Sequence, residues 1–372
     1  MRKYLLSAAI LPALLGSATA DTYQATNWMA PAHILNEYPY QQFAKDVAAA
    51  SDGAIEFEVY SSGALVPAPT TMQGIGDSVA QLGIVYPPYN PSELPLNNAV
   101  NDQAFTARDS TAAAFAYTEL GLTNARVQAE WNGNGGLFLG GYATPFYTLI
   151  CMSDIVSPKD VSGKKVRVAG TAQTAWIQSL GGVPVSVPIG DVYSGMERGS
   201  IDCTMSDATN LDKGNKFWEI AKTVNTLPQG VVLGATYVVG TDFWAGLEPA
   251  ERRVLLDNMA VGLARSQAAY NVGVAAALEG SKERGLKVSE PTQEMTDTLA
   301  AFQSKVAAEL PAKSMAERKI EDPTEVLKQF VALEDRWIDL LKDVNKDDPE
   351  ALAAVLKTNL YDGIDETTFG TN

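Results

Sequence analysis

Short apolar runs separated by glycine turns dominate the middle of the chain, between Gly163 and Asp207. β-Branched and apolar residues suit the pleated, buried surface of a sheet, and here they predict three strands, at 165–169, 183–187 and 201–205. Polar caps and following glycines predict two intervening helices, at 171–180 and 191–198. This alternation predicts parallel strands joined by right-handed crossovers.

The same alternation is predicted nearer the amino terminus, with strands at 21–28, 54–60 and 79–86 and helices at 33–50 and 70–77. An Ala-rich amphipathic stretch predicts one helix over 110–130, and Gly133 to Thr144 is expected to re-enter the sheet. The β-branched run 230–239 is predicted as a strand shared by both sheets. A long helix is predicted over 250–282, because Pro249 suits a helix start.

Residues 1–20 have the pattern of a secretory signal peptide. Arg2 and Lys3 precede an apolar core that is too short to span a bilayer, and Ala18-Thr19-Ala20 is a small-x-small cleavage site. An exported product beginning at Asp21 is therefore expected. The remaining chain is too long for a single core, which predicts two domains.

The formal charge of −16 becomes −18 when Arg2 and Lys3 are removed with the signal peptide. This charge argues against nucleic acid or an anionic membrane as a partner. Motifs for a nucleophile elbow, a metal-binding histidine pair or a phosphate-binding loop are absent from the sequence, and no cofactor is expected. The only histidine is His33, and two cysteines with one histidine cannot make a standard structural zinc site.

Arg167 stands near the carboxyl end of a strand of the buried type, where open α/β sheets bind ligands. A buried guanidinium needs a partner, and its planar fork of donors suits a carboxylate. That carboxylate belongs either to the protein, with Asp207 as a candidate, or to a ligand. From spacing alone, the internal ion pair is the favoured reading.

Four segments instead favour a ligand carboxylate as the partner of Arg167: GKKVRV at 163–168, LGG-VPV at 180–185, DVYSGMERGSID at 191–202 and NKFWEIAKTV at 215–224. They resemble the periplasmic solute receptors of TRAP transporters, the C4-dicarboxylate-binding type, and the similarity extends over most of the chain after residue 20. The resemblance implies an α/β fold of two domains with a ligand cleft between them and a long helix that spans both. It implies a periplasmic receptor that is not an enzyme, closes over a small organic carboxylate and delivers it to TRAP permease subunits in the membrane. Arg167 occupies the position of the arginine that pairs with the carboxylate.

The expected domain boundaries follow from this comparison and from the predicted elements. Domain one is expected to comprise 21–144 plus 228–271, and domain two 145–227 plus 272–372. Hinge closure of the two domains would trap the ligand. Two other classes remain open: an exported α/β enzyme acting on a small organic acid, which would have to use His33, and an exported protein-binding scaffold.

Further ligand-binding candidates lie near predicted strand ends. Tyr147 falls where many relatives place a second arginine, which favours a monocarboxylate or a zwitterion over a dicarboxylate. In several relatives an asparagine near the position of Ser206 holds the substrate, so Ser206 is a candidate here. Asp207, the next residue, would either pair with Arg167 or bind an ammonium or hydroxyl group of the ligand. The remaining candidates each have a structural alternative to ligand binding. For Trp28 it is packing in the core, and for His33 a solvated or helix-capping role. For Tyr86 and Tyr89 it is a place in a rigid loop.

The two cysteines, Cys151 and Cys203, lie in apolar runs predicted to belong to one sheet. Export permits a disulfide. A bridge between them is the favoured prediction, and two buried free thiols are the alternative.

Overall fold

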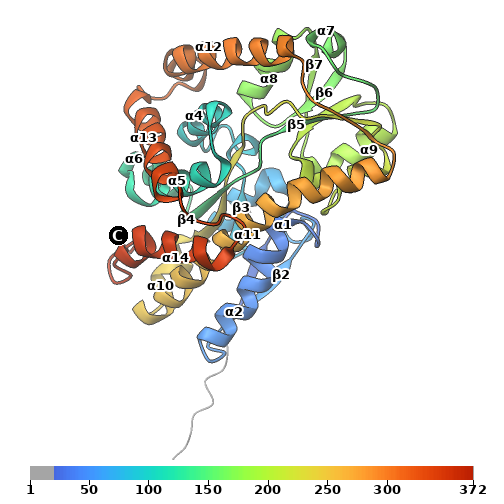
Figure 1. Ribbon diagram of the computed structural model, residues 1–372. Coiled ribbons are helices and arrows are strands. Elements are labelled where there is room, and N and C mark those ends of the chain that lie inside the picture. Colours follow the sequence, from blue (N-terminus) through green and yellow to red (C-terminus); the bar gives the residue numbers. More distant parts are fainter. Residues whose placement is uncertain (1–20, 372) are drawn as a thin grey trace, which may run out of the picture.

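The computed structural model describes residues 21–371, so the predicted signal peptide lies outside the described residues. The strands form two sheets, which confirms the predicted α/β fold (Figure 1). The first sheet has the order β2-β1-β3-β10-β4, with β1 (Asp21–Thr26), β2 (Ile55–Tyr60), β3 (Leu82–Val85), β4 (Gly136–Ala143) and β10 (Leu233–Gly240). The second has the order β11-β9-β5-β8-β6-β7, with β5 (Thr148–Cys151), β6 (Lys165–Val168), β7 (Val183–Ser186), β8 (Cys203–Ser206), β9 (Thr223–Asn225) and β11 (Lys287–Ser289).

In the first sheet β1 pairs in parallel with β2 and β3, as the alternating pattern predicts. Strand β10 runs antiparallel to both β3 and β4. Every residue of β4 and β10 is buried, because helices cover the sheet. These helices are α1 (Ile34–Asn36), a π-helical segment (Glu37–Gln42), α2 (Phe43–Ala50), α3 (Thr71–Gly76), α4 (Pro95–Gln103), α5 (Ser110–Thr123), α6 (Ala125–Asn132) and α10 (Thr241–Gly246).

The helix predicted over 110–130 is divided at Asn124. The Asn124 side chain accepts hydrogen bonds from the backbone N–H groups of Arg126 and Val127, so this residue caps α6 while its own N–H closes α5. Asparagine is a strong helix cap, which explains the break inside a continuous helical pattern.

The second sheet contains the strands predicted around Arg167. Strand β6 lies between β7 and β8 and is parallel to both, which confirms the predicted parallel pairing. Three helices accompany this sheet: α7 (Pro158–Val161), α8 (Thr171–Ser179) and α9 (Val192–Glu197). Gly181, with φ of +74°, turns the chain from α8 into β7.

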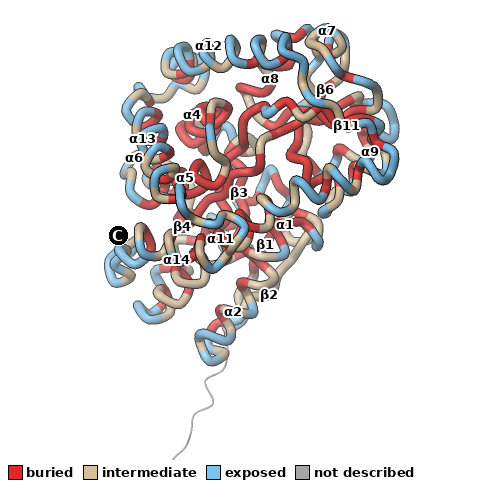
Figure 2. The backbone as a smooth tube through the Cα atoms, viewed as in Figure 1, coloured by how far each residue is buried: buried red, intermediate tan, exposed pale blue. Residues whose placement is uncertain are grey.

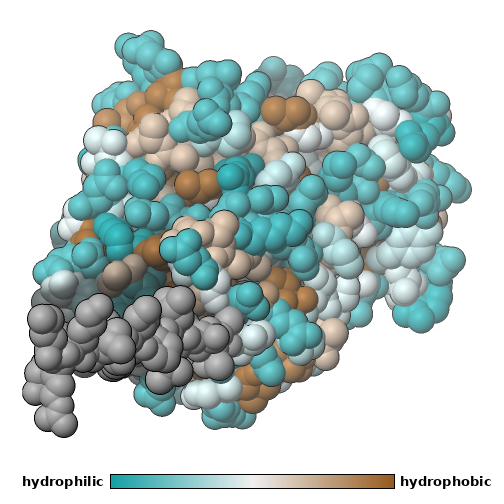
Figure 3. Space-filling model, turned by 90° about the horizontal axis from the view of Figure 1, so that it is seen from below, coloured by the Kyte–Doolittle hydropathy of each residue, from teal (hydrophilic) through white to brown (hydrophobic). Residues whose placement is uncertain are grey.

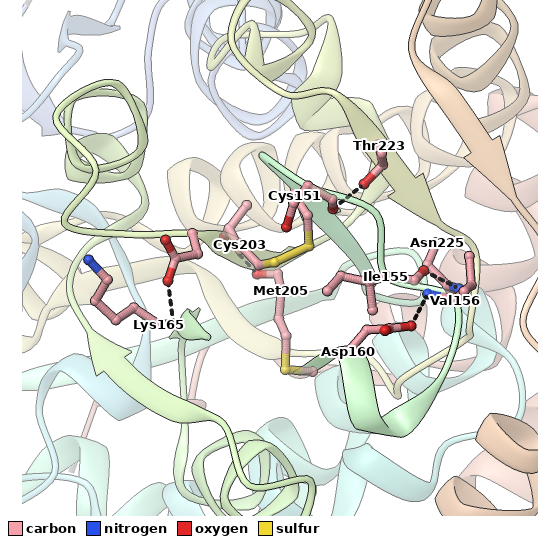
Figure 4. The surroundings of a disulfide bond; sticks show 12 residues. Cys151, Ile155, Val156, Asp160, Lys165, Cys203, Met205, Thr223 and Asn225 are labelled. Carbon is pink, nitrogen blue, oxygen red and sulfur yellow. Dashed lines mark hydrogen bonds between the residues drawn. A yellow bond between two sulfur atoms is a disulfide. The ribbon is translucent and has the colours of Figure 1, made fainter. Parts of the chain in front are cut away.

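The disulfide between Cys151 and Cys203 lies in the same sheet. The two residues are register partners on the antiparallel strands β5 and β8, with Cα atoms 4.1 Å apart, and their sulfur atoms are bonded at 2.12 Å. Figure 4 shows the bridge between the two strands above Met205. The predicted bridge is therefore present in the structure, and neither cysteine is free.

Two of the passages of the chain between the sheets, from β4 to β5 and from β9 to β10, lie side by side. The backbone N–H of Thr144 donates to the carbonyl of Val232 at 3.0 Å, and the backbone N–H of Tyr147 donates to the carbonyl of Gly230 at 2.8 Å. The prediction that 230–239 is a strand shared by both sheets is wrong, because β10 begins at Leu233 and pairs only with β3 and β4.

The long helix α11 (Pro249–Glu283) confirms the helix predicted over 250–282. Its 35 residues span about 52 Å, at about 1.5 Å per residue. It packs against α2 and β4 beside the first sheet and against β11 of the second. Figure 1 shows it crossing the molecule toward α9, so one continuous helix contacts both halves.

Three further helices complete the chain: α12 (Gln293–Arg318), α13 (Thr324–Leu340) and α14 (Pro349–Asn359). Helix α12 contacts both α4 and α7, whereas α13 packs on α5 and α14 on α11. The expected domain boundaries stay a prediction. The packing of α13 and α14 favours moving these two helices to the first domain.

Buried residues follow the central strands of both sheets and the helices around them, while much of α12 and the turn after α9 are exposed (Figure 2). The face seen in Figure 3 is mainly hydrophilic with small hydrophobic patches, in keeping with the acidic composition. Within residues 21–371, no helix has the length and apolar character needed to cross a membrane.

Candidate functional site

A cavity lies between the two sheets. Its walls include residues from both sheets, from the two passages between them and from α11. Seven of the eight predicted ligand-binding residues line it: Trp28, His33, Tyr86, Tyr89, Tyr147, Arg167 and Asp207. Ser206 stands behind the wall, where its Oγ accepts a hydrogen bond of 3.0 Å from Nδ2 of the lining residue Asn210.

Arg167 reaches the cavity from β6 and is 1% exposed. Its Nε donates to the carbonyl oxygen of Val187 at 3.0 Å, and Nη1 lies 3.5 Å from that of Met205. Its Nη2 donates to the Tyr89 hydroxyl at 3.0 Å. Arg167 forms no ion pair with a carboxylate of the part of the chain that the structure describes. The favoured reading from spacing, an internal ion pair, is therefore wrong.

Tyrosine side chains surround the guanidinium. The Tyr89 oxygen accepts from Arg167 and also from the backbone N–H of Ile189 at 3.1 Å, so its own proton remains available to another acceptor. Tyr147 is hydrogen-bonded to Arg167, and burial raises the pKa of its phenol, which therefore stays neutral at pH 7. These neutral donors and the guanidinium together suit a carboxylate.

Three aromatic rings pack along this wall and join the two halves of the molecule. The rings of Tyr86 and Tyr89 lie edge to face at 4.9 Å, and those of Trp28 and Tyr89 at 5.4 Å. Trp28 donates to the Ile84 carbonyl at 3.0 Å, which fixes its indole. The Tyr86 hydroxyl donates to the carbonyl of Ala169, at the end of β6, so a residue of the first half contacts the second.

His33 is a buried helix cap, 3% exposed. Its Nδ1 accepts a hydrogen bond of 3.1 Å from the backbone N–H of Leu35, which places the ring proton on Nε2. Burial lowers the pKa of His33 to about 4, although a hydrogen bond with Asn210 opposes this shift. The capping interpretation is confirmed and the solvated one is wrong. Because Leu35 and Asn210 engage this ring, the structure lends no support to a Ser–His catalytic pair.

Asp207 follows β8 and is 1% exposed. It caps the 3₁₀ turn η6 (Ala208–Leu211), where its carboxyl accepts from the N–H of Thr209 at 3.0 Å, from the Thr209 hydroxyl and from Nδ2 of Asn210 at 2.7 Å. Burial raises the pKa of Asp207 to about 6, while these hydrogen bonds act to lower it. The side chain is therefore mostly ionised at pH 7.

Sequence reasoning missed four polar residues of the wall: Tyr142, Thr144, Asn210 and Tyr270. Tyr142 stands near the end of β4, a position that the predicted strand and the strand-end rule could have found. Tyr270 comes from the middle of α11, where helical periodicity gives a buried face but not the part of the molecule it faces. Within residues 21–371, no cluster of three or more His, Cys, Asp or Glu side chains is placed to hold a metal ion.

The model of the family "bacterial extracellular solute-binding protein, family 7" matches residues 25–314. A solute-binding protein of Chromohalobacter salexigens is 25% identical over 313 residues, covering 81% of this chain and 88% of its own. The ectoine-binding periplasmic protein TeaA of Halomonas elongata is 23% identical over 346 residues, covering 89% and 96%. A TRAP solute-binding protein of Rhodoferax ferrireducens, solved with copurified benzoate, superposes with a TM-score of 0.76 at 18% identity, covering 86% of this chain and 99% of its own. Because the family model spans most of the chain and the fold is that of these receptors, the protein belongs to the family 7 extracellular solute-binding proteins, the periplasmic receptors of TRAP transporters.

Proposed function

We propose that the protein binds a small organic carboxylate in the cavity between its two sheets, with Arg167 pairing with the carboxylate, and delivers it to a TRAP permease. One observation carries this proposal: a buried guanidinium lines the cavity without any carboxylate partner from residues 21–371. Burying an unpaired charge is costly, so a charge kept at a cavity wall favours a ligand of opposite sign. Two of the relatives named above bind ectoine or carry copurified benzoate, and both compounds contain a carboxylate.

Closure of the two halves is the proposed mechanism. Residues of the first half reach the second across the cavity, as with Tyr86 and the Ala169 carbonyl or Tyr89 and Arg167. These contacts would form when the halves close and would bury the ligand between them. The closed molecule would present a joint surface of both halves to the permease.

The test is calorimetric titration of ligand-stripped residues 21–372 with mono- and dicarboxylates, sugar acids and zwitterions. Arg167→Ala should weaken binding at least 100-fold, because it removes the two hydrogen bonds of an arginine–carboxylate pair. Each hydrogen bond to a charged group contributes about 1.5–3 kcal/mol, and about 1.4 kcal/mol is tenfold in affinity. Arg167→Lys should also bind much more weakly, since an ammonium cannot reproduce the planar fork. Wild-type affinity in Arg167→Ala would show that the anchor is misassigned.

Arg252→Lys is the matched control. Arg252 is a buried arginine outside the cavity that donates to the backbone carbonyls of Trp244 at 3.0 Å and Ala245 at 3.1 Å. Its replacement should lower the free energy of unfolding and leave affinity unchanged. An equal loss of affinity in both variants would mean that stability, and not recognition, controls binding.

A further inference from the structure

The cavity wall holds two side chains of opposite charge that are not paired with each other. Arg167 and Asp207 both stand at the carboxyl ends of the neighbouring parallel strands β6 and β8. Arg167 is the register partner of Thr204, so Asp207 lies three residues further along, about 10 Å at about 3.3 Å per residue. Tyr147 interacts electrostatically with both charges. The cavity therefore has a positive and a negative pole.

The negative pole has no positively charged partner within the protein. Asp207 accepts two hydrogen bonds from Thr209, one from Asn210 and one from its own backbone N–H, and all of these donors are neutral. No lysine or arginine of the described chain forms an ion pair with it. Burying a carboxylate without a cation lowers the stability of the folded protein, so its position in the cavity wall favours a role in binding a cationic group.

Two tyrosines accompany this carboxylate in the cavity wall. The hydroxyl of Tyr270 is buried and has no hydrogen-bond partner among the described residues. The negative charge of Asp207 acts on the phenols of both Tyr142 and Tyr270. Aromatic faces beside a carboxylate are a favourable environment for a cationic nitrogen.

A dicarboxylate does not fit this distribution of charge. Arg167 is the only lysine or arginine in the cavity wall, and His33 is buried in its neutral form. A second ligand carboxylate near Asp207 would meet a like charge, and two like charges repel strongly in a buried site. A ligand with one charge of each sign would satisfy both poles.

We infer that the ligand is a zwitterion, with its carboxylate at Arg167 and a cationic nitrogen held by the carboxylate of Asp207 and the rings of Tyr142 and Tyr270. The Arg167 half of this inference rests on the proposed function. The nitrogen site is independent of it, because it rests on the unpaired Asp207 and on the unpartnered hydroxyl of Tyr270.

The experiment compares zwitterions with acids of the same shape in which carbon replaces nitrogen. The pairs are proline and cyclopentanecarboxylate, glycine betaine and 3,3-dimethylbutyrate, and 4-aminobutyrate and pentanoate, which span different separations of charge. Ligand-stripped protein is titrated calorimetrically at pH 7.5. In at least one pair the zwitterion should bind tenfold or more tightly than its carbon analogue. Asp207→Asn should bring that ratio close to one.

Tyr270→Phe provides a second test that does not depend on the folding of the Asp207 variant. Its hydroxyl has no partner to lose, so the fold should persist while the affinity for the zwitterion falls several-fold and that for the carbon analogue does not. Tyr237→Phe is the matched control, because Tyr237 also has a buried, unpartnered hydroxyl but lies outside the cavity wall. It should leave both affinities unchanged.

The outcomes separate the two proposals. If the carbon analogues bind as tightly as the zwitterions, and their binding is lost in Arg167→Ala, the carboxylate anchor stands and the nitrogen site is overturned. An affinity ratio that survives Asp207→Asn also overturns the nitrogen site. If no compound of either series binds to folded wild-type protein, both proposals fail.

Discussion

His33 and Asp207 are both buried at the cavity, yet acidification should shift stability in opposite directions through them. Each group makes a hydrogen bond with Asn210. The replacements His33→Asn and Asp207→Asn remove one titrating group at a time. Asparagine at 33 can still accept from the Leu35 N–H, so the cap of α1 is retained.

The sign follows from which state binds the proton more tightly. The pKa of Asp207 is about 6 in the folded protein against 3.8 ordinarily, so its contribution is fully present below pH 3.8 and lost as pH rises through 6. The pKa of His33 is about 4 against 6.5, so its contribution is present above pH 6.5 and lost as pH falls through 4. Between pH 7.5 and 5.0, Asp207 should stabilise the fold by about 1.4 kcal/mol and His33 should destabilise it by about 2 kcal/mol.

The assay is urea unfolding of ligand-stripped protein at pH 7.5 and 5.0, in phosphate so that no buffer carboxylate enters the cavity. The quantity compared is the change in unfolding free energy between the two pH values, because the many other acids then cancel between variant and wild type. Relative to wild type, acidification should cost Asp207→Asn about 1.4 kcal/mol more and His33→Asn about 2 kcal/mol less. Identical changes in all three proteins would refute the opposed titrations.

Two further predictions concern contacts outside the charged poles. Replacing Cys151 and Cys203 together by alanine should lower the unfolding free energy by about 4 kcal/mol. This is the loop-closure entropy of the unfolded chain for a separation of 52 residues. An unchanged midpoint of urea unfolding would contradict this prediction. Asp102→Ala removes the carboxylate that accepts from the N–H of Ala172 at 2.9 Å and pairs with the largely buried Arg318, so unfolding free energy should fall by about 3–5 kcal/mol. Asp102 lies on α4, and Ala172 lies in the first turn of α8 in the other half. Calorimetry should therefore also show weaker ligand binding, and unchanged affinity would exclude this contact from closure.

The sequence predicted best the elements whose determinants are local. Glycine turns and β-branched runs placed β6, β7 and β8 and their parallel order, and with them the strand that carries Arg167. The long helix α11 was also predictable, because its 35 residues contain no proline after the first. The break at Asn124 was not foreseen, since a capping side chain interrupts an otherwise continuous helical pattern.

The cavity wall depended on information that is not local. Tyr270 stands far along the chain from every other wall residue, and its place was decided by how α11 packs across both halves. The run at 230–239 was assigned to both sheets because β-branched residues favour strands without specifying partners. Backbone pairing confined β10 to the first sheet and left Gly230 and Val232 to bind the other passage.

The sequence could not decide whether Arg167 and Asp207 pair with each other or stay apart. The structure shows why they stay apart. Neutral groups hold both side chains: the carbonyls of Val187 and Met205 hold Arg167, while Thr209 and Asn210 hold Asp207. An ion pair at 4 Å would be worth about 4 kcal/mol at an effective dielectric of about 20, and a ligand would have to break it before binding. Separate charges avoid that loss, so the uncompensated burial that weakens the empty fold becomes affinity when a ligand supplies the missing partners.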